Sequence, residues 1–366
     1  MYNVKDYVCS FSKLYKAAQI CRRNVKWKDS VAHFTNHSLV SVYKLKQQID
    51  NRTYQISPYS VFMIREPKLR IITSTRFKDR VFQRSLCDNY LTNEISRDFI
   101  ADNYACQKGK GTDKARECIE RHLKSFYRSN GVNGYVLKVD IHDYFGSTDH
   151  EYAIKQVKAR VRDEWTFNEV KRIIESFNSN GDYTKGIGLG SQVSQLIQLA
   201  VLDNIDHYIK EKLCVKLYVR YMDDFVLIHE SKDYLKKCLK KIVSLLKRQK
   251  LTISQKKTNI FPITQPIRFL GFSFRIMKSG KVTKRILPSN IKAQRRKIKK
   301  LYKRVLEGKM TIEKFEECYQ SWRAFVKKTD SRGRMLKMDK FKNKLKGELL
   351  CQMSNTLKQL NKPLSH

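Results

Sequence analysis

Hydrophobic residues in the first part of the chain recur every three or four positions, as Phe11, Leu14 and Ala18 do. This spacing predicts amphipathic helices through the first fifty residues. The range 54–72 changes to short apolar runs rich in β-branched residues and separated by prolines, which predicts strands. Helices are therefore expected to lead into a short β-structure.

Later stretches predict a sheet and a long helix. The range 135–141 is rich in β-forming residues, and Asp140 falls near its end. The runs 217–222 and 225–228 are apolar and flank two aspartates, a pattern typical of a hairpin with carboxylates at its turn. Apolar residues within 193–213 keep helical spacing and leave one face polar, which predicts a long helix packed on the core.

Basic residues become dense after Gly280. Eight of the thirteen residues from Lys292 to Arg304 are Lys or Arg, with apolar residues interleaved at helical spacing, so a basic helical region is expected over 281–366. A chain of 366 residues has room for two or three domains. The pattern divides it into N-terminal helices and strands over 1–134, a central sheet region over 135–280 and this C-terminal region.

The net charge of the chain indicates which class of partner it binds. Lys and Arg number 75 against 35 Asp and Glu, which leaves a formal net charge of +40. Such a charge repels itself unless a polyanion neutralises it, and nucleic acid is the expected polyanion. The sequence contains neither a long apolar run nor a secretory leader, so a cytoplasmic protein without a membrane partner is expected. The nine cysteines lack zinc or redox spacing.

Asp140, Asp223 and Asp224 are the candidates for chemistry. Pairing of the predicted strands would bring the three carboxylates together. Carboxylates about 4 Å apart repel by roughly 4 kcal/mol at an effective dielectric of about 20, and a cation offsets this repulsion. Nucleotidyl transfer uses such a group, because two hard cations activate the attacking hydroxyl and hold the triphosphate. The alternative for Asp223 and Asp224 is a solvated turn.

Tyr221-Met222-Asp223-Asp224 resembles the active-site tetrad of reverse transcriptases, and Val139-Asp140-Ile141-His142-Asp143-Tyr144-Phe145 resembles the first carboxylate motif of that family. The resemblance implies an α+β right-hand polymerase with fingers interleaved with an antiparallel palm, and a helical thumb. It implies an RNA-directed DNA polymerase that binds template RNA, cDNA and dNTPs. It also implies two Mg²⁺ ions, with Mn²⁺ as a substitute, held by Asp140, Asp223, Asp224 and the backbone carbonyl of Ile141.

The resemblance extends to segments that contact nucleotide and nucleic acid. Phe145 falls where the family excludes the sugar 2′-hydroxyl, and Lys257 falls where it has a catalytic lysine near the leaving pyrophosphate. Arg80 has an alternative role as a structural partner of Asp79 or of the core. The implied nucleotide-binding residues are Arg70, Lys68, Arg80, Phe145, Leu189, Gly190 and Gln195. The implied nucleic-acid contacts are Lys108, Lys110, Arg295, Arg296 and Lys299.

Two segments resemble the reverse transcriptases of diversity-generating retroelements. These are 104–112, with the sequence Tyr-Ala-Cys-Gln-Lys-Gly-Lys-Gly-Thr, and 190–195, with the pattern Gly-x-x-x-Ser-Gln. Leu189 stands where accurate relatives have a glutamine that bonds the nucleotide, which predicts error-prone synthesis. This subtype also implies a small basic accessory variability protein as a partner. Gly146 and Gly188 replace prolines usual in that group, which leaves a defence-associated prokaryotic reverse transcriptase as an alternative.

Alternatives from other classes stay open at this point. One is a non-catalytic RNA-binding or maturase-like module, in which the basic residues and the aromatics (11% of the chain) bind RNA. The acidic triad would then be vestigial. Another is an RNA-synthesising polymerase, which the bulk of Phe145 disfavours, because such polymerases typically have an acidic residue there.

Overall fold

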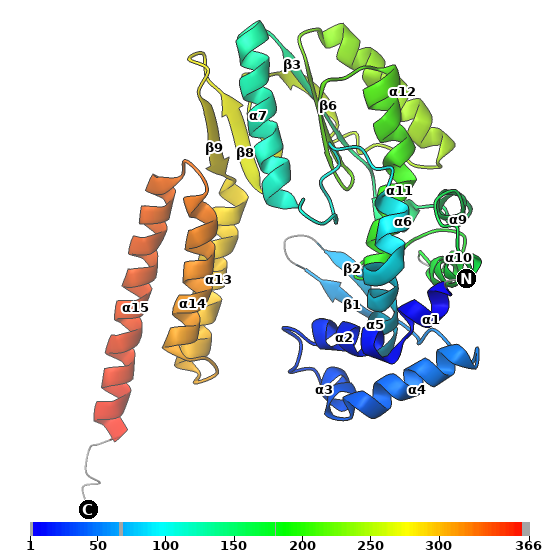
Figure 1. Ribbon diagram of the computed structural model, residues 1–366. Coiled ribbons are helices and arrows are strands. Elements are labelled where there is room, and N and C mark those ends of the chain that lie inside the picture. Colours follow the sequence, from blue (N-terminus) through cyan, green and yellow to red (C-terminus); the bar gives the residue numbers. More distant parts are fainter. Residues whose placement is uncertain (1–2, 66–68, 180, 361–366) are drawn as a thin grey trace, which may run out of the picture. The chain divides into compact units, whose positions relative to one another are not determined.

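Figure 1 shows the computed structural model of the chain, which describes residues 3–65, 69–179 and 181–360, with the backbone alone at Arg70 and 349–360. The chain forms two compact units. Unit 1 comprises Met1–Cys118 and Tyr135–Phe261, and unit 2 comprises Ile119–Gly134 and Pro262–His366. The three functional regions expected from the sequence remain predictions. No helix within the described ranges is long and apolar enough to cross a membrane.

A four-stranded sheet lies at the centre of unit 1. Its order is β4 (Leu217–Tyr221), β5 (Asp224–His229), β3 (Tyr135–Asp140) and β6 (Asn259–Pro262). β5 runs antiparallel to both β3 and β4. Both faces of β3 are covered, since its residues Val136, Leu137 and Val139 are fully buried. α12 (Lys232–Arg248) packs against β3 and β5. The strand and the hairpin predicted from the sequence are confirmed.

α11 (Gln192–His207) is the long helix of unit 1, and the side chain of its N-cap Ser191 accepts a hydrogen bond from a backbone amide of the first turn. It continues into one π-helical turn, η2 (Tyr208–Lys212). The predicted long helix packed on the core is confirmed, and its polar face is buried as well, since Gln198, Asp203 and Asp206 are buried. α9 (His150–Lys158) and α6 (Thr92–Ser96) pack against the helix. Its polar groups must therefore bond to protein instead of water.

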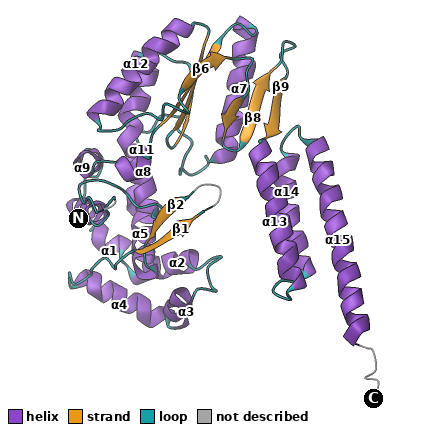
Figure 2. Ribbon diagram, turned by 180° about the vertical axis from the view of Figure 1, so that it is seen from behind, coloured by secondary structure: helices purple, strands orange, loops and turns teal. Residues whose placement is uncertain are grey.

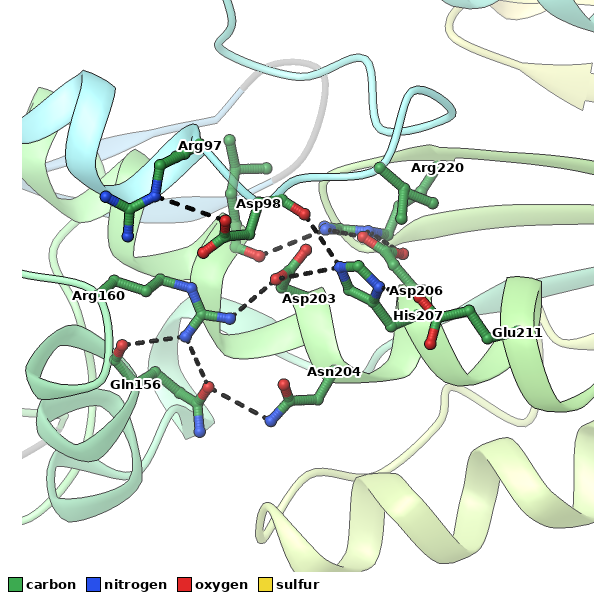
Figure 3. A network of polar contacts seen from close by, with 12 residues as sticks. Arg97, Asp98, Gln156, Arg160, Asp203, Asn204, Asp206, His207, Glu211 and Arg220 are labelled. Atoms are coloured by element: carbon green, nitrogen blue, oxygen red, sulfur yellow. Dashed lines mark hydrogen bonds and ion pairs between the residues drawn. The ribbon is translucent and has the colours of Figure 1, made fainter.

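Figure 3 shows the buried polar network that results. Asp206 accepts a hydrogen bond from Arg220 Nε at 2.7 Å. It also accepts one from the Tyr218 hydroxyl, which the figure does not label, at 2.6 Å. Asp203 accepts one from Arg160 at 2.8 Å. Arg220 and Asp206 have no exposed surface, so each is the counter-charge that makes burial of the other tolerable. The pair fixes β4 against α11.

The N-terminal part of unit 1 is mainly helical and carries one antiparallel hairpin, β1 (Ser60–Ile64) and β2 (Arg70–Ser74). This hairpin confirms the strands predicted within 54–72. α2 (Phe11–Cys21) packs on α4 (Ser38–Asp50) and α5 (Phe77–Leu86). The other elements of unit 1 are α1 (Val4–Val8), α3 (Asp29–Asn36), η1 (Cys87–Leu91), α8 (Tyr144–Ser147) and α10 (Glu164–Glu175).

Unit 2 contains a three-stranded antiparallel sheet, β7 (Ile267–Phe269), β8 (Phe272–Ile276) and β9 (Val282–Ile286). Helices follow it, namely α13 (Pro288–Leu306), α14 (Ile312–Lys327) and α15 (Arg332–Leu360), as Figure 2 shows. The region expected as helical from 281 therefore begins with a strand, because β9 pairs with β8. The rings of Phe272 and Phe325 lie 4.8 Å apart, which joins the sheet to α14.

α7 (Thr112–Asn130) enters unit 2 at Ile119. Its Tyr127 hydroxyl donates a hydrogen bond to the carbonyl of Lys278, at 2.9 Å. Gly280 has a φ of +80°, and a Cβ atom there would lie 2.4 Å from the Tyr127 ring. The turn between β8 and β9 therefore requires glycine both for its backbone conformation and for space.

Replacement of Arg220 by alanine is expected to lower the free energy of unfolding by about 3–5 kcal/mol, because Asp206 would stay buried without its counter-charge. Urea denaturation followed by circular dichroism measures the change. Arg97→Ala is the matched control, since Arg97 pairs with Asp98 at 3.5 Å and its side chain is 42% exposed. The control should change stability by less than about 1 kcal/mol, and equal losses for both variants would contradict the assignment.

Candidate active site

The tetrad Tyr221-Met222-Asp223-Asp224 lies at the turn of the β4–β5 hairpin, at the end of the central sheet. Tyr221 pairs with Asp224, so Met222 and Asp223 form a two-residue turn. Met222 has a φ of +54°, as hairpin turns of this length require of their first central residue. Asp140 is the register partner of Asp224 across β3 and β5. Cα atoms of directly opposed residues lie about 4.5–5.5 Å apart, so three carboxylates converge from two strands and a turn.

Two lysines neutralise carboxylates of this group. Lys257 Nζ forms an ion pair and a hydrogen bond with Asp140 Oδ1. Lys138 Nζ lies 3.2 Å from Asp224 Oδ1. Burial raises the pKa of Asp224 to about 7; Lys138 opposes this rise, and the charges of Asp223 and Asp140 add to it. The group is therefore crowded with negative charge and contains its own cations.

The donor set of this group fits a hard divalent cation. Mg²⁺ prefers carboxylate oxygens, and Asp140, Asp223 and Asp224 supply only oxygens. Asp224 Oδ1 is buried, and its ion-pair partner is the ammonium of Lys138 at 3.2 Å. Two lysines face three crowded carboxylates, so a bound divalent cation would offset the charge that the lysines leave. Ile141 is buried and forms an isolated bridge with Ile253 just beyond β3, and its carbonyl remains a predicted ligand.

Arg220 bonds to the backbone of the turn, a role that the sequence pattern did not predict. Its Nη1 donates to the carbonyl of Met222 at 3.0 Å, and its Nη2 donates to the carbonyl of Leu199 at 3.3 Å. One buried guanidinium thus connects the turn to α11. The signal in the sequence was an arginine within an apolar strand, next to the tetrad. Lys138 left a similar signal, because it is a charged residue inside the β3 run.

The loop 186–190 lies beside Phe145. The amide of Ile187 donates to the carbonyl of Phe145 at 2.7 Å. Phe145 is half-buried and meets Tyr144 edge-on, with ring centroids 5.9 Å apart. A Cβ atom at Gly188 would lie 2.3 Å from the Phe177 ring. The ring of Phe177 therefore occupies the space that any side chain at position 188 would need.

Gly190 and Leu189 continue this loop. Gly190 has a φ of +117°, and a Cβ atom there would lie 3.7 Å from the carbonyl oxygen of Thr73 in β2. The loop thus approaches β2, the strand that begins with Arg70. Leu189 is half-buried. The nucleotide-binding roles of both residues remain predictions.

Gln195 connects the loop to a second predicted segment. Cys106 Sγ donates a hydrogen bond to Gln195 Oε1 at 3.3 Å, and Cys106 has a φ of +51°. Lys110 donates to the carbonyls of Ile100, Ala101 and Asn103 at 3.3, 3.1 and 2.7 Å. Its ammonium is therefore directed into the protein, whereas Lys108 is exposed. The predicted phosphate contact of Lys110 would need these bonds to break.

The fingers residues are described in part. Lys68 lies outside the described residues, and only the backbone of Arg70 is described, at the start of β2. Arg80 Nη2 donates to Ser74 Oγ at 3.3 Å and to the carbonyl of Thr75 at 3.4 Å. Asp79 instead accepts from the Tyr54 hydroxyl and the Ser57 amide. The alternative pairing of Arg80 with Asp79 is therefore not the one formed.

The three predicted contacts of the thumb lie in unit 2. Arg295, Arg296 and Lys299 are exposed on α13. The guanidinium of Arg295 stacks over the ring of Phe341 at 5.3 Å, so this side chain also helps to pack α13 against α15. Their contacts with nucleic acid remain predictions.

The family of the chain follows from a comparison with known proteins. The family model "Reverse transcriptase (RNA-dependent DNA polymerase)" matches residues 64–274. This range is more than half of the chain and includes Asp140, Asp223 and Asp224. The chain belongs to the reverse transcriptase family. Its helices and antiparallel sheets form the α+β fold of a right-hand polymerase.

Individual relatives match parts of the chain. The group II intron-encoded protein LtrA of Lactococcus lactis subsp. cremoris is 32% identical over 112 residues, which are 28% of this chain and 18% of LtrA. The apo telomerase of Candida tropicalis is 14% identical with a TM-score of 0.46, over 60% of this chain and 47% of the telomerase. Telomerase of Candida albicans in complex with a TWJ fragment of telomeric RNA is 12% identical with a TM-score of 0.48, over 72% and 54%. The chain thus spans less than two thirds of each relative.

Removal of one carboxylate is expected to weaken divalent-cation binding by roughly tenfold or more, because the remaining oxygens cannot complete the coordination shell. Isothermal titration of the protein with Mn²⁺ measures this for Asp140→Asn and Asp223→Asn. Asp143→Asn is the matched control, since Asp143 is an exposed neighbour that follows β3. An unchanged affinity in both active-site variants, or an equal loss in the control, would refute this metal site.

Proposed function

We propose that the protein is an RNA-directed DNA polymerase that extends a primer on template RNA by two-metal nucleotidyl transfer. The convergence of Asp140, Asp223 and Asp224 at the end of the sheet carries this proposal. Membership of the reverse transcriptase family supports it. The net charge of +40 suits template RNA and cDNA as partners.

The proposed chemistry divides between the carboxylates and the residues around them. Bound Mg²⁺ ions, or Mn²⁺ in their place, would lower the pKa of the primer 3′-hydroxyl and neutralise the triphosphate. The carboxylates of Asp140, Asp223 and Asp224 would hold the ions, together with the carbonyl of Ile141. Lys257 is 47% exposed at its side chain while it pairs with Asp140. It is therefore able to leave that carboxylate and neutralise the departing pyrophosphate.

Recognition of the nucleotide is assigned to the neighbouring segments. Arg70, with Lys68 and Arg80, would bind the triphosphate, since a guanidinium matches two phosphate oxygens at once. Phe145 would exclude the 2′-hydroxyl of a ribonucleotide. Its backbone bond to Ile187 ties it to the loop that carries Leu189, so sugar and base selection would depend on one rigid unit.

Within the family we assign the protein to diversity-generating retroelements. The hydrogen bond between Cys106 and Gln195 supports this assignment, because it joins the two segments whose sequences resemble that subtype. The side chain of Leu189 cannot donate or accept a hydrogen bond, so base-pair geometry would be tested less strictly and cDNA synthesis would be error-prone. A small basic accessory protein belongs to the same assignment. Our alternative assignment is a defence-associated reverse transcriptase.

Primer extension with Asp223→Asn tests the polymerase proposal. Wild-type protein should extend a DNA primer on an RNA template with dNTPs and Mg²⁺. The rate of the variant should be at least about 100-fold lower, because it lacks one ligand of the metal ions that neutralise the transition-state charge. The variant should bind RNA with the same affinity as the wild-type protein. A variant that extends at the wild-type rate would refute the metal assignment. A wild-type protein that binds RNA but never extends a primer would favour a non-catalytic RNA-binding module.

Phe145→Ala tests the choice of sugar. The variant should incorporate ribonucleotides at least about tenfold more readily relative to dNTPs, because the truncated side chain no longer contacts the 2′-position. Competition between rNTPs and dNTPs in single-nucleotide extension measures the ratio. Tyr144→Phe is the control, since it changes a buried aromatic neighbour and keeps its ring. An unchanged ratio in Phe145→Ala would indicate an RNA-synthesising polymerase or another steric gate.

A further inference from the structure

The loop 100–111, which precedes α7, pairs with the central sheet of unit 1. β4 is an edge strand of that sheet. The amide of Tyr104 donates to the carbonyl of Arg220 at 3.0 Å, and the amide of Arg220 donates to the carbonyl of Asp102 at 3.0 Å. Asn103 forms an isolated parallel bridge with Arg220. The loop therefore covers the free edge of β4 at the residue directly before the tetrad.

The ammonium of Lys110 holds this loop together from within. It donates to the carbonyls of Ile100, Ala101 and Asn103 at 3.3, 3.1 and 2.7 Å. The carbonyl of Asn103 also accepts a hydrogen bond from the side-chain amide of Gln107, at 2.8 Å. An ammonium has three N–H donors, so each donor of Lys110 has an acceptor within one turn of the loop.

The surroundings of Lys110 also favour an internal role. Its side chain is half-buried, and its ammonium lies 5.6 Å from the centroid of the Tyr104 ring. Burial lowers the pKa of Lys110; the charges of Asp102 and Asp206 oppose this fall, and the charge of Arg220 adds to it. A charge that has lost part of its hydration needs protein acceptors in exchange. The carbonyls of the loop supply these acceptors.

The same loop contacts a residue of the predicted nucleotide site. Cys106 Sγ donates a hydrogen bond to Gln195 Oε1 at 3.3 Å, and Gln195 lies in the first turn of α11. Cys106 has a φ of +51°, which is uncommon for a residue with a Cβ atom. Such a conformation persists only where the surrounding structure enforces it. The bonds of Lys110 enforce it here, because they close the loop on both sides of Cys106.

We propose that Lys110 is a positioning residue, which closes the loop 100–111 on β4 and thereby holds Cys106 against Gln195 for nucleotide binding. Its ammonium acts on the nucleotide site through the protein, in place of the predicted contact with RNA phosphate. The role given to Gln195 rests on the proposed function, whereas the closure of the loop by Lys110 does not.

Amide hydrogen exchange of the full chain tests whether Lys110 closes the loop. In Lys110→Met, the amides of Tyr104 and Gly111 should exchange at least about tenfold faster than in wild type, because the loop opens when its carbonyls lose their donor. The amides of β5, a central strand, should keep their wild-type rates. Lys114→Met is the matched control, since it removes the same charge from an exposed position on α7. It should leave the loop amides unchanged.

Binding of a fluorescent single-stranded RNA over a series of salt concentrations separates positioning from phosphate contact. Each phosphate contact on a single strand contributes about 0.7 to the slope of log affinity against log salt. Lys110→Met should keep the wild-type slope. Lys108→Met is the comparison, because Lys108 is exposed in the same loop, and its loss should lower the slope by about 0.7.

Single-nucleotide extension measures the consequence for the nucleotide. Lys110→Met should raise the KM for dNTP at least about fivefold and change kcat less than about threefold, because Gln195 loses its partner while the carboxylates stay in place. Lys110→Arg should restore most of the lost affinity, since a guanidinium also donates several hydrogen bonds. If Lys110→Met does not fold, Lys110→Gln gives the same comparison, because its amide keeps two donors but not the charge.

Three results would overturn the proposal. The first is a fall of about 0.7 in the salt slope of Lys110→Met, which would assign Lys110 to RNA phosphate. The second is equally faster exchange in the loop and in β5, which would indicate a general loss of stability. The third is a wild-type KM in a variant whose loop has opened. Exchange and RNA binding involve no catalysis, so their failure is distinct from a wild-type protein that never extends a primer.

Discussion

Mutual repulsion of carboxylates at one end of the central sheet is the constraint on which unit 1 depends. The β3–β5 register brings Asp140 opposite Asp224, and the hairpin turn adds Asp223. Lys257 and Lys138 offset part of this charge. Burial still raises the pKa of Asp224 to about 7. A sheet end in this state favours cation binding, because a divalent ion offsets the carboxylate charge that the two lysines do not neutralise.

Two ion pairs near this group, Arg220–Asp206 and Lys257–Asp140, differ in how much free energy their separation would cost. Arg220 and Asp206 have no exposed surface, and the guanidinium also bonds the carbonyl of Met222. Separation of this pair would leave two buried charges, so it fixes the geometry of the turn. Lys257 is about half exposed in its pair with Asp140. The loss of this ion pair therefore costs little free energy, which suits a residue proposed to leave Asp140 and bind the departing pyrophosphate.

Unit 2 uses its basic residues in more than one way. Arg295 of α13 is exposed and stacks over Phe341 of α15. Its side chain therefore both packs two helices together and leaves its charge accessible to solvent. Arg268, Arg275 and Arg285 of the β7–β9 sheet instead line a cavity of about 310 Å³, and each is next in its strand to a buried apolar residue, namely Phe269, Phe274 and Ile286. Strand alternation makes this possible, since the same three strands bury one face and present guanidiniums on the other.

The sequence by itself determined the family-defining segments, the strand 135–141, the hairpin and the positions of the long helix, because periodicity and local motifs are properties of neighbouring residues. Only tertiary structure decided which charges are buried. Asp203 and Asp206 belong to the polar face of α11 in the sequence, and only the packing of α9 and α6 on this helix buries them. Arg220 and Lys138 are visible in the sequence as charges inside apolar strands, but the groups that they bond to are not. Their partners come from distant positions, and burial turns an ordinary polar residue into one that must find a counter-charge.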